Sequence, residues 1–184
     1  MDDLSNQFYE LASKTGNKAP ELQEMIALLK ILGRLPTIDQ KMKYGNSLGE
    51  YSPSKNLISF HPAYGLNINT VPHEFSHALD EAMGGYAGQI RNANKTNDQS
   101  KFLDAYDKLD PLTSKLIPQG KNDPYRYDRG ELRAHGVGNA AGPYTLGDMF
   151  KMAPARTHID STMATEAAIL RDLLKRSLNN GTNR

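Results

Sequence analysis

The apolar positions of this chain follow a helical period over most of its length. In residues 19–34 they repeat every three or four positions, at Leu22, Met25, Ile26, Leu29 and Leu32, which is the spacing of one face of an amphipathic helix. A second stripe lies near the C-terminus, at Met163, Ala167, Leu170, Leu174 and Leu178. Similar patterns predict helices over residues 4–14 and 98–110, the latter ended by Pro111. We expect a mainly helical protein whose C-terminal stripe packs in the core.

The period changes in the segment GEYSPSKNLISFHP, residues 49–62. A Ser-Pro-Ser-Lys-Asn turn precedes Leu57, Ile58 and Phe60, a short extended run that Pro62 stops. We predict a hairpin or a pair of short strands there, beside the helix that follows. The expected fold class is therefore α+β, mainly helical with a small sheet.

The following helix is predicted to begin with Thr70 as its cap and to end at the pair Gly84-Gly85. Pro72 suits its first turn, because proline has no amide hydrogen to lose there. Four apolar residues form one face of this helix: Val71, Phe75, Ala78 and Leu79. Its other face is therefore available to line a cleft without loss of core packing.

That other face carries the sequence His73-Glu74-x-x-His77. Side chains four residues apart project from the same side of a helix, so both imidazoles can bind one metal ion. Glu74 lies beside them, where its carboxylate can accept a proton from a water that the metal activates. This pattern is typical of a zinc hydrolase, and we expect Zn²⁺ as the cofactor. The plain alternative is a partly buried helix whose histidines bond to backbone carbonyls.

A catalytic zinc needs a third protein ligand and an open position. Three residues are candidates: Asp80, Glu131 and His135. Asp80 follows His77 on the same helix and is better placed to bond a ligand imidazole or a nearby loop. Glu131 and His135 share one face of a later helix, which we expect to enter a glycine-rich turn over residues 136–142.

Three segments, HEFSHALDEAMGGYAG, QSKFLDAYDKL and ELRAH, resemble the catalytic region of gluzincin metalloproteases of the anthrax lethal factor type, a group that includes the Pro-Pro endopeptidases. The resemblance covers about residues 48–140. It implies a zincin-like metallopeptidase fold, Glu131 as the third zinc ligand, and an endopeptidase that cleaves a peptide or protein substrate.

Two positions depart from the family pattern. In the family an acidic residue follows the ligand glutamate by one turn and orients a ligand histidine. His135 stands at that position here, so the orienting role is either taken by this histidine or lost. The family tyrosine that stabilises the oxyanion falls at Pro124, with Tyr125 and Tyr127 just after it, and we expect Tyr125 to take this role. Two alternatives stay open: an inactive zincin fold that serves as a binding or structural module, and a zinc amidase.

Composition and length indicate which partners to expect and how many domains the chain forms. The chain has 22 basic and 21 acidic side chains and a net charge of +1, without a basic run, so we expect no nucleic-acid partner. It has no cysteine, which excludes disulfides and thiolate ligands. Its 184 residues suit one domain over residues 1–184.

The hydropathy of the chain indicates no membrane partner. No run approaches the roughly 20 apolar residues that span a bilayer. The N-terminal segment begins with acidic residues and lacks the apolar core of a signal peptide. As the sequence is written we expect a cytoplasmic protein, although domains of this kind also occur as parts of delivered toxins, effectors or virions.

Overall fold

Most of the described chain is helical, as the apolar periods predict. A computed structural model describes residues 3–14, 20–40, 47–63, 65–67, 69–116, 129–141 and 154–181. Its helices are α1 (Asp3–Lys14), α2 (Pro20–Ile31), α3 (Thr70–Arg91), α4 (Asn97–Leu116), α5 (Arg129–Ala141) and α7 (Pro154–Gly181). Its strands are β1 (Thr37–Asp39), β2 (Gly49–Ser52) and β3 (Leu57–Phe60), with the 3-10 turn η1 (Pro53–Lys55) between the last two. The α+β class is confirmed at this level.

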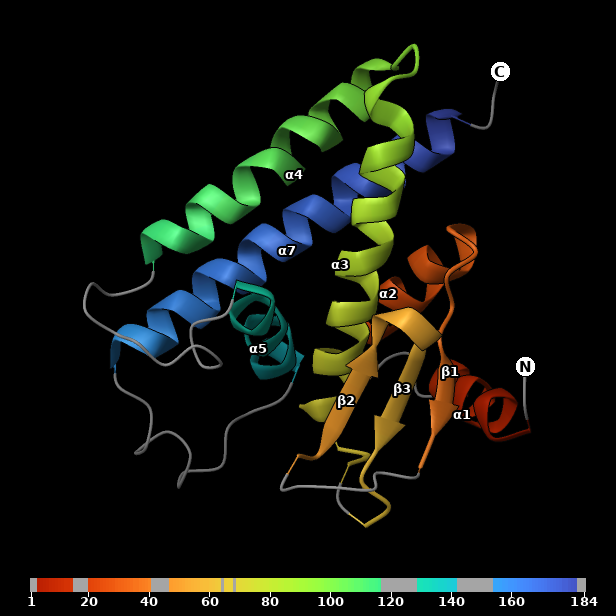
Figure 1. The fold of residues 1–184 in the computed structure, drawn as a ribbon. Helices are drawn as coiled ribbons and strands as arrows, with labels where there is room; N and C mark the ends of the chain where they lie inside the picture. The colour runs from red at the N-terminus through yellow and green to blue at the C-terminus, as the bar shows by residue number, and fades with distance from the viewer. Residues whose placement is uncertain are drawn as a thin grey trace.

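The three strands form one sheet in the order β1-β3-β2, with β2 packed beside α3 (Figure 1). β2 and β3 pair in antiparallel fashion, with Gly49 opposite Phe60, which confirms the predicted hairpin. β1 pairs in parallel with β3 and was not predicted, because a three-residue strand is too short to show an alternating pattern. β2 is therefore an edge strand, and it lies on the same side of the sheet as α5 (Figure 1).

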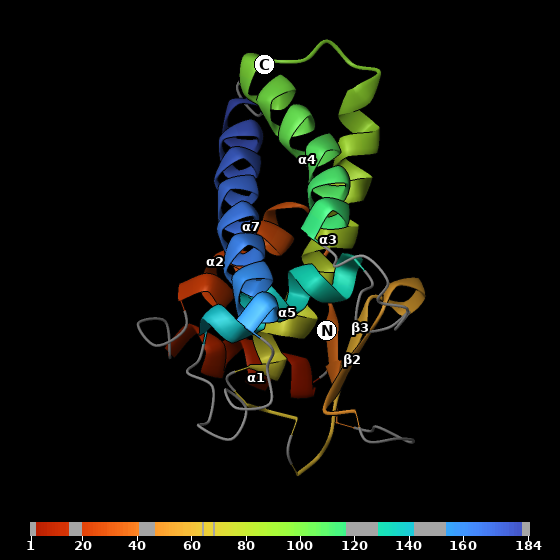
Figure 2. The ribbon, with the colours of Figure 1, turned by 90° about the vertical axis from the view of Figure 1, so that its left-hand side faces the viewer.

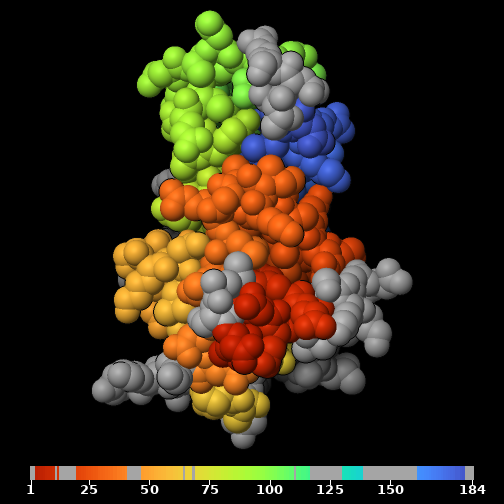
Figure 3. Space-filling view, turned by 90° about the vertical axis from the view of Figure 1, so that its right-hand side faces the viewer, coloured from red at the N-terminus to blue at the C-terminus, as the bar shows by residue number. Residues whose placement is uncertain are grey.

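α3 is the central helix, and its apolar face is buried as predicted. Phe75 is completely buried, and its ring stacks on that of Phe8 in α1 with 5.8 Å between centroids. Phe8 also stacks on Phe60 of β3. Figure 3 shows this side of the molecule, where α2 crosses the middle and α1 lies below it, beside the strands. The opposite, polar face of α3 carries His73 and His77 and is turned toward α5.

α7 packs along α4 and α5 (Figure 2). Its predicted apolar stripe is confirmed as core, since Met163, Leu170 and Leu174 are almost fully buried. Arg171 donates to Glu24 of α2 at 2.7 Å and ties α7 to the N-terminal part of the chain. In the part of the chain that the structure describes, none of the helices has the length and apolar character needed to cross a membrane.

Both predicted ends of α3 are wrong. The helix continues through Gly84-Gly85 to Arg91, because Ala87 and Ile90 beyond the glycines are buried in the core, and this packing outweighs a cost of about 1 kcal/mol for each glycine. At the N-terminus, Thr70 is the first helical residue and the cap position is Asn69, whose side chain makes no capping bond; the first backbone amides bond to Asn67 instead. Its side-chain oxygen accepts from the backbone N–H groups of Asn69 and Thr70, at 3.0 and 2.8 Å.

Two further helix ends also differ from the prediction. α4 passes through Pro111 to Leu116, because the buried Thr113 and the packing of Leu112 and Leu116 against the cluster of Leu132 and Met163 hold the last turn in place. α5 continues as far as Ala141, so residues 136–141 are helical where a glycine-rich turn was expected. The glycines of α5 therefore lie within a helix, where glycine is unfavourable, so the reason for their presence must be sought in the residues that pack against them.

Candidate metal centre

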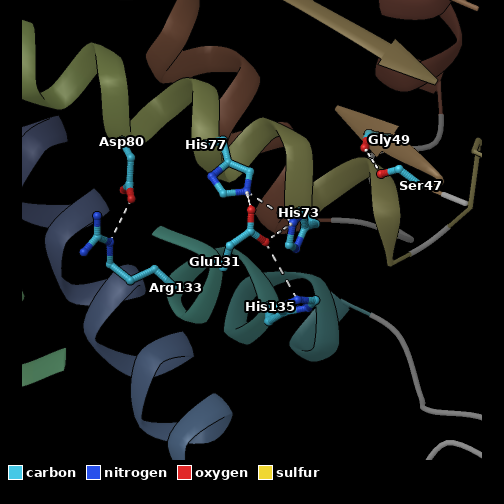
Figure 4. Close-up of polar contacts among 8 residues, drawn as sticks. All are labelled: Ser47, Gly49, His73, His77, Asp80, Glu131, Arg133 and His135. Atoms are coloured by element: carbon cyan, nitrogen blue, oxygen red, sulfur yellow. Dashed lines mark hydrogen bonds and ion pairs between the residues drawn. The ribbon is translucent and has the colours of Figure 1, made fainter. Parts of the chain in front are cut away.

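α3 and α5 bring His73, His77 and Glu131 together (Figure 4). The Nε2 atoms of the two histidines are 3.2 Å apart. Glu131 Oε2 lies 3.3 Å from His73 Nε2, and Glu131 Oε1 lies 3.5 Å from His77 Nε2. Among the His, Asp and Glu residues that the structure describes, these three have potential ligand atoms that all lie within 4.8 Å of one another. Glu131, which the resemblance implies as the third ligand, thus lies next to both imidazoles.

The separations of these atoms fit a zinc site. Tetrahedral zinc with bonds of about 2.0–2.1 Å has ligand atoms about 3.3–3.4 Å from one another. The three observed separations, 3.2, 3.3 and 3.5 Å, lie close to that value. Two neutral imidazole nitrogens that face each other at 3.2 Å also repel unless a cation or a proton lies near them. One carboxylate and two imidazoles leave a fourth position open, as a catalytic zinc requires.

The electrostatics of the group favour a cation at its centre. Burial raises the pKa of Glu131, but hydrogen bonds from His73 and His77 and their charges outweigh it, so the pKa lies well below the usual range. Burial lowers the pKa of the His77 imidazole, but the hydrogen bond and charge of Glu131, with the charges of Glu74 and Asp80, give a net upward shift. Negative charge therefore surrounds the two imidazoles.

Glu74 lies beside this group and is only 5 % exposed. Burial raises the pKa of its carboxyl group, the charges of His73 and His77 lower it, and those of Glu131 and Glu50 raise it, with a net upward shift. A carboxylate with a raised pKa is a stronger base than one in water. The raised pKa of Glu74 is compatible with its predicted role as the base, which stays a prediction.

Gly49 of β2 makes room for Glu74. A Cβ atom at this position would lie 2.7 Å from both Cγ and Oε1 of Glu74, and 2.8 Å from Cγ2 of Thr70. These distances are too short for any side chain, so the glycine lets the strand approach the carboxylate directly. Sequence reasoning missed Gly49, because the motif around Glu74 carries no signal of the strand that packs against it.

Asp80 joins α3 to α5. Its Oδ2 accepts a hydrogen bond from Nε of Arg133 at 2.8 Å (Figure 4). Among the described residues Asp80 has no hydrogen bond to a ligand imidazole, which is one of the two partners that the sequence suggested. Arg133 was not singled out from the sequence, although it follows Glu131 by two residues.

His135 borders the same group. Its Nε2 lies 3.9 Å from Glu131 Oε2, and its ring centroid lies 4.5 Å from that of His73. This placement is compatible with the predicted role of orienting a ligand, which stays a prediction. The two tyrosines weighed for the oxyanion, Tyr125 and Tyr127, lie outside the described residues, so the role expected of Tyr125 also stays a prediction.

The three candidate ligands, His73, His77 and Glu131, line a cavity of about 770 Å³. Along α3 the cavity extends from His73 to Gly85, and its other walls come from β2, α4 and α5. Tyr106 of α4 contributes to the wall opposite Gly84, where its hydroxyl lies 3.0 Å from a Cβ placed on the glycine. The candidate ligands, Glu74 and the edge strand therefore share one open space.

We compared the chain with known proteins and found no match. No protein-family model, curated protein or solved structure matches this chain. The evidence for the candidate metal centre is therefore the arrangement of side chains from α3 and α5, and the evidence for the gluzincin resemblance is the sequence motifs.

Proposed function

We propose that this protein is a zinc-dependent endopeptidase of the gluzincin type. The observation that carries the proposal is the convergence of His73, His77 and Glu131 at zinc-ligand separations, with Glu74 beside them. All four side chains border the same cavity. This is the arrangement that metal-assisted hydrolysis needs: three ligands, an open position and an adjacent base.

The edge of β2 supports a peptide as the substrate. Leu48 and His61 form a hydrogen-bonded pair, with His61 N donating to Leu48 O at 2.9 Å. In an antiparallel ladder such pairs alternate, so the backbone groups of Gly49 and Tyr51 point away from β3. Ser47 Oγ donates to Gly49 O at 2.7 Å, which agrees with a carbonyl that points away from β3 (Figure 4). An extended peptide can add to such an edge through main-chain hydrogen bonds.

Each side chain has a distinct task in the proposed reaction. Zinc, when bound by His73, His77 and Glu131, would polarise the scissile carbonyl and lower the pKa of a water molecule to about 7. Glu74 accepts a proton from the attacking water as the C–O bond forms, and then gives this proton to the leaving nitrogen, after which the C–N bond breaks. β2 holds the peptide beside Glu74 while this occurs.

The test is peptide cleavage that depends on zinc. A peptide library is incubated with the metal-free and the zinc-loaded protein, and products are identified by mass spectrometry. We expect cleavage only with zinc, loss of cleavage on chelation and its return when zinc is restored. Hydrolysis of small amides without cleavage of peptides would point to an amidase instead. Zinc binding without hydrolysis of either substrate would support the inactive module.

The substitution Gly49→Ala tests the position of the base. The added methyl group must displace Glu74 or the strand, and a misplacement of about 1 Å can cost about 100-fold in rate. We expect kcat to fall about 10- to 100-fold and zinc affinity to change little, because the ligands lie on α3 and α5. Gly88→Ala is the matched control, since an added Cβ there meets no atom within 4 Å. Unchanged kcat in Gly49→Ala would show that Glu74 does not depend on this contact.

A further inference from the structure

We propose that α5 is held on α3 by a two-point clamp that places Glu131 between the two imidazoles. One point is the contact of Gly138 with Asn69 and His73, and the other is the ion pair of Arg133 with Asp80. The inference rests on the proposed metal centre, and it assigns Gly138 and Arg133 as positioning residues for the third ligand.

The two helices run in opposite directions where they meet. As residue numbers rise along α3 they fall along α5: Gly138 lies against Asn69, His135 lies against His73, and Glu131 reaches His77. Glu131, His135 and Gly138 are spaced by four and three residues, so they share one face of α5. A displacement of this face at one residue therefore moves the others with it.

Gly138 allows α5 to lie close to the start of α3. A Cβ atom on Gly138 would lie 2.7 Å from the backbone oxygen of Asn69 and 3.2 Å from Cβ of His73. These two atoms belong to the backbone of α3 or are fixed to it, so neither can swing aside as the end of a long side chain can. Glycine weakens a helix interior relative to alanine. The close approach gives a physical reason for glycine here.

The ion pair of Arg133 with Asp80 fixes the other end. Arg133 Nε lies 2.8 Å from Asp80 Oδ2, and the two side chains are only 15 % and 21 % exposed. Solvent therefore screens this pair less than it screens pairs on the open surface. Glu131 precedes Arg133 in α5, but its carboxylate meets α3 at His73 and His77, which lie between Asn69 and Asp80. It is 3.3 and 3.5 Å from the two imidazole nitrogens. Metal ligands tolerate errors of only about 0.2 Å, so a small shift of α5 should weaken binding.

The test measures zinc affinity by competition with a chromophoric chelator. We expect Gly138→Ala to bind zinc about 10- to 100-fold more weakly, as losses of groups that support ligands do. Gly88→Ala, on the outer part of α3, should bind as the wild type does. The decisive arm adds Gly138→Ala to Glu131→Gln. If Gly138 acts through Glu131, the second change should cost far less in the double variant than it does alone.

Circular dichroism and thermal unfolding establish that each variant is folded. Folded Gly138→Ala that binds zinc as tightly as the wild type would overturn the inference, as would losses that add fully in the double variant. If Gly138→Ala does not fold, Arg133→Met tests the other point of the clamp, with an expected loss of about tenfold and the same dependence on Glu131. An unchanged affinity there would overturn the inference. Wild-type protein that takes up no zinc would refute the metal centre itself, a separate outcome.

Discussion

Glu74→Gln should remove most of the peptidase activity and leave zinc binding intact. Glutamine keeps the shape of the side chain but cannot accept the proton of the attacking water. Loss of a general base commonly lowers the rate by about 10²- to 10⁴-fold, or about 3–5 kcal/mol of transition-state stabilisation. Zinc content should not change, because His73, His77 and Glu131 remain in place. The measurement is kcat/KM on a cleaved peptide, with zinc measured in the same samples.

Glu166→Gln provides the matched control for this experiment. It makes the same chemical change on α7, at a residue that does not border the metal cavity, and its activity should equal that of the wild type. If both proteins cleave the peptide at the same rate, well above that of a protein-free sample and at equal zinc content, another group is the base. If neither exceeds that background although zinc is bound, the inactive module is favoured.

Glu131→Gln should weaken zinc binding by at least tenfold, and by more than Asp80→Asn or His135→Ala. A neutral amide would replace the carboxylate that faces both imidazoles at 3.3 and 3.5 Å. Loss of a ligand costs more than loss of a group that supports one, which is typically worth about 10- to 100-fold. Affinities for the three variants come from the same chelator competition, with Gly88→Ala as reference.

The reverse order of effects would change the ligand assignment. If His135→Ala releases zinc and Glu131→Gln retains it, then His135 is the third ligand. The geometry argues for Glu131, because among the described residues its carboxylate forms a group with His73 and His77 whose potential ligand atoms all lie within 4.8 Å of one another, and His135 is not part of that group.

The sequence predicted the features of the site that depend on spacing within one helix. His73 and His77 face the same way because they are four residues apart, and Phe75 is buried because it lies on the opposite side of α3. The residues alone left Asp80, Glu131 and His135 as candidates for the third ligand, and the gluzincin resemblance implied Glu131. These are local properties of the chain.

The features that were missed depend on how the helices and strands approach one another. Gly49 and Gly138 are needed because a strand and a helix come within a few ångströms of α3, and no sequence period reports such contacts. Arg133 finds Asp80 through the same packing. The wrong helix ends at Gly84 and Pro111 have a related cause, because buried side chains beyond them outweigh local preference.

Zinc uptake by the wild-type chain tests the central claim most directly. The protein is stripped of metal, titrated with zinc and examined by elemental analysis after removal of unbound metal. We expect about one zinc per chain, as one group of two imidazoles and a carboxylate with an open position would bind. His77→Ala in parallel should lose most of this binding. A folded wild-type protein that carries no metal and takes up none on titration would contradict the account.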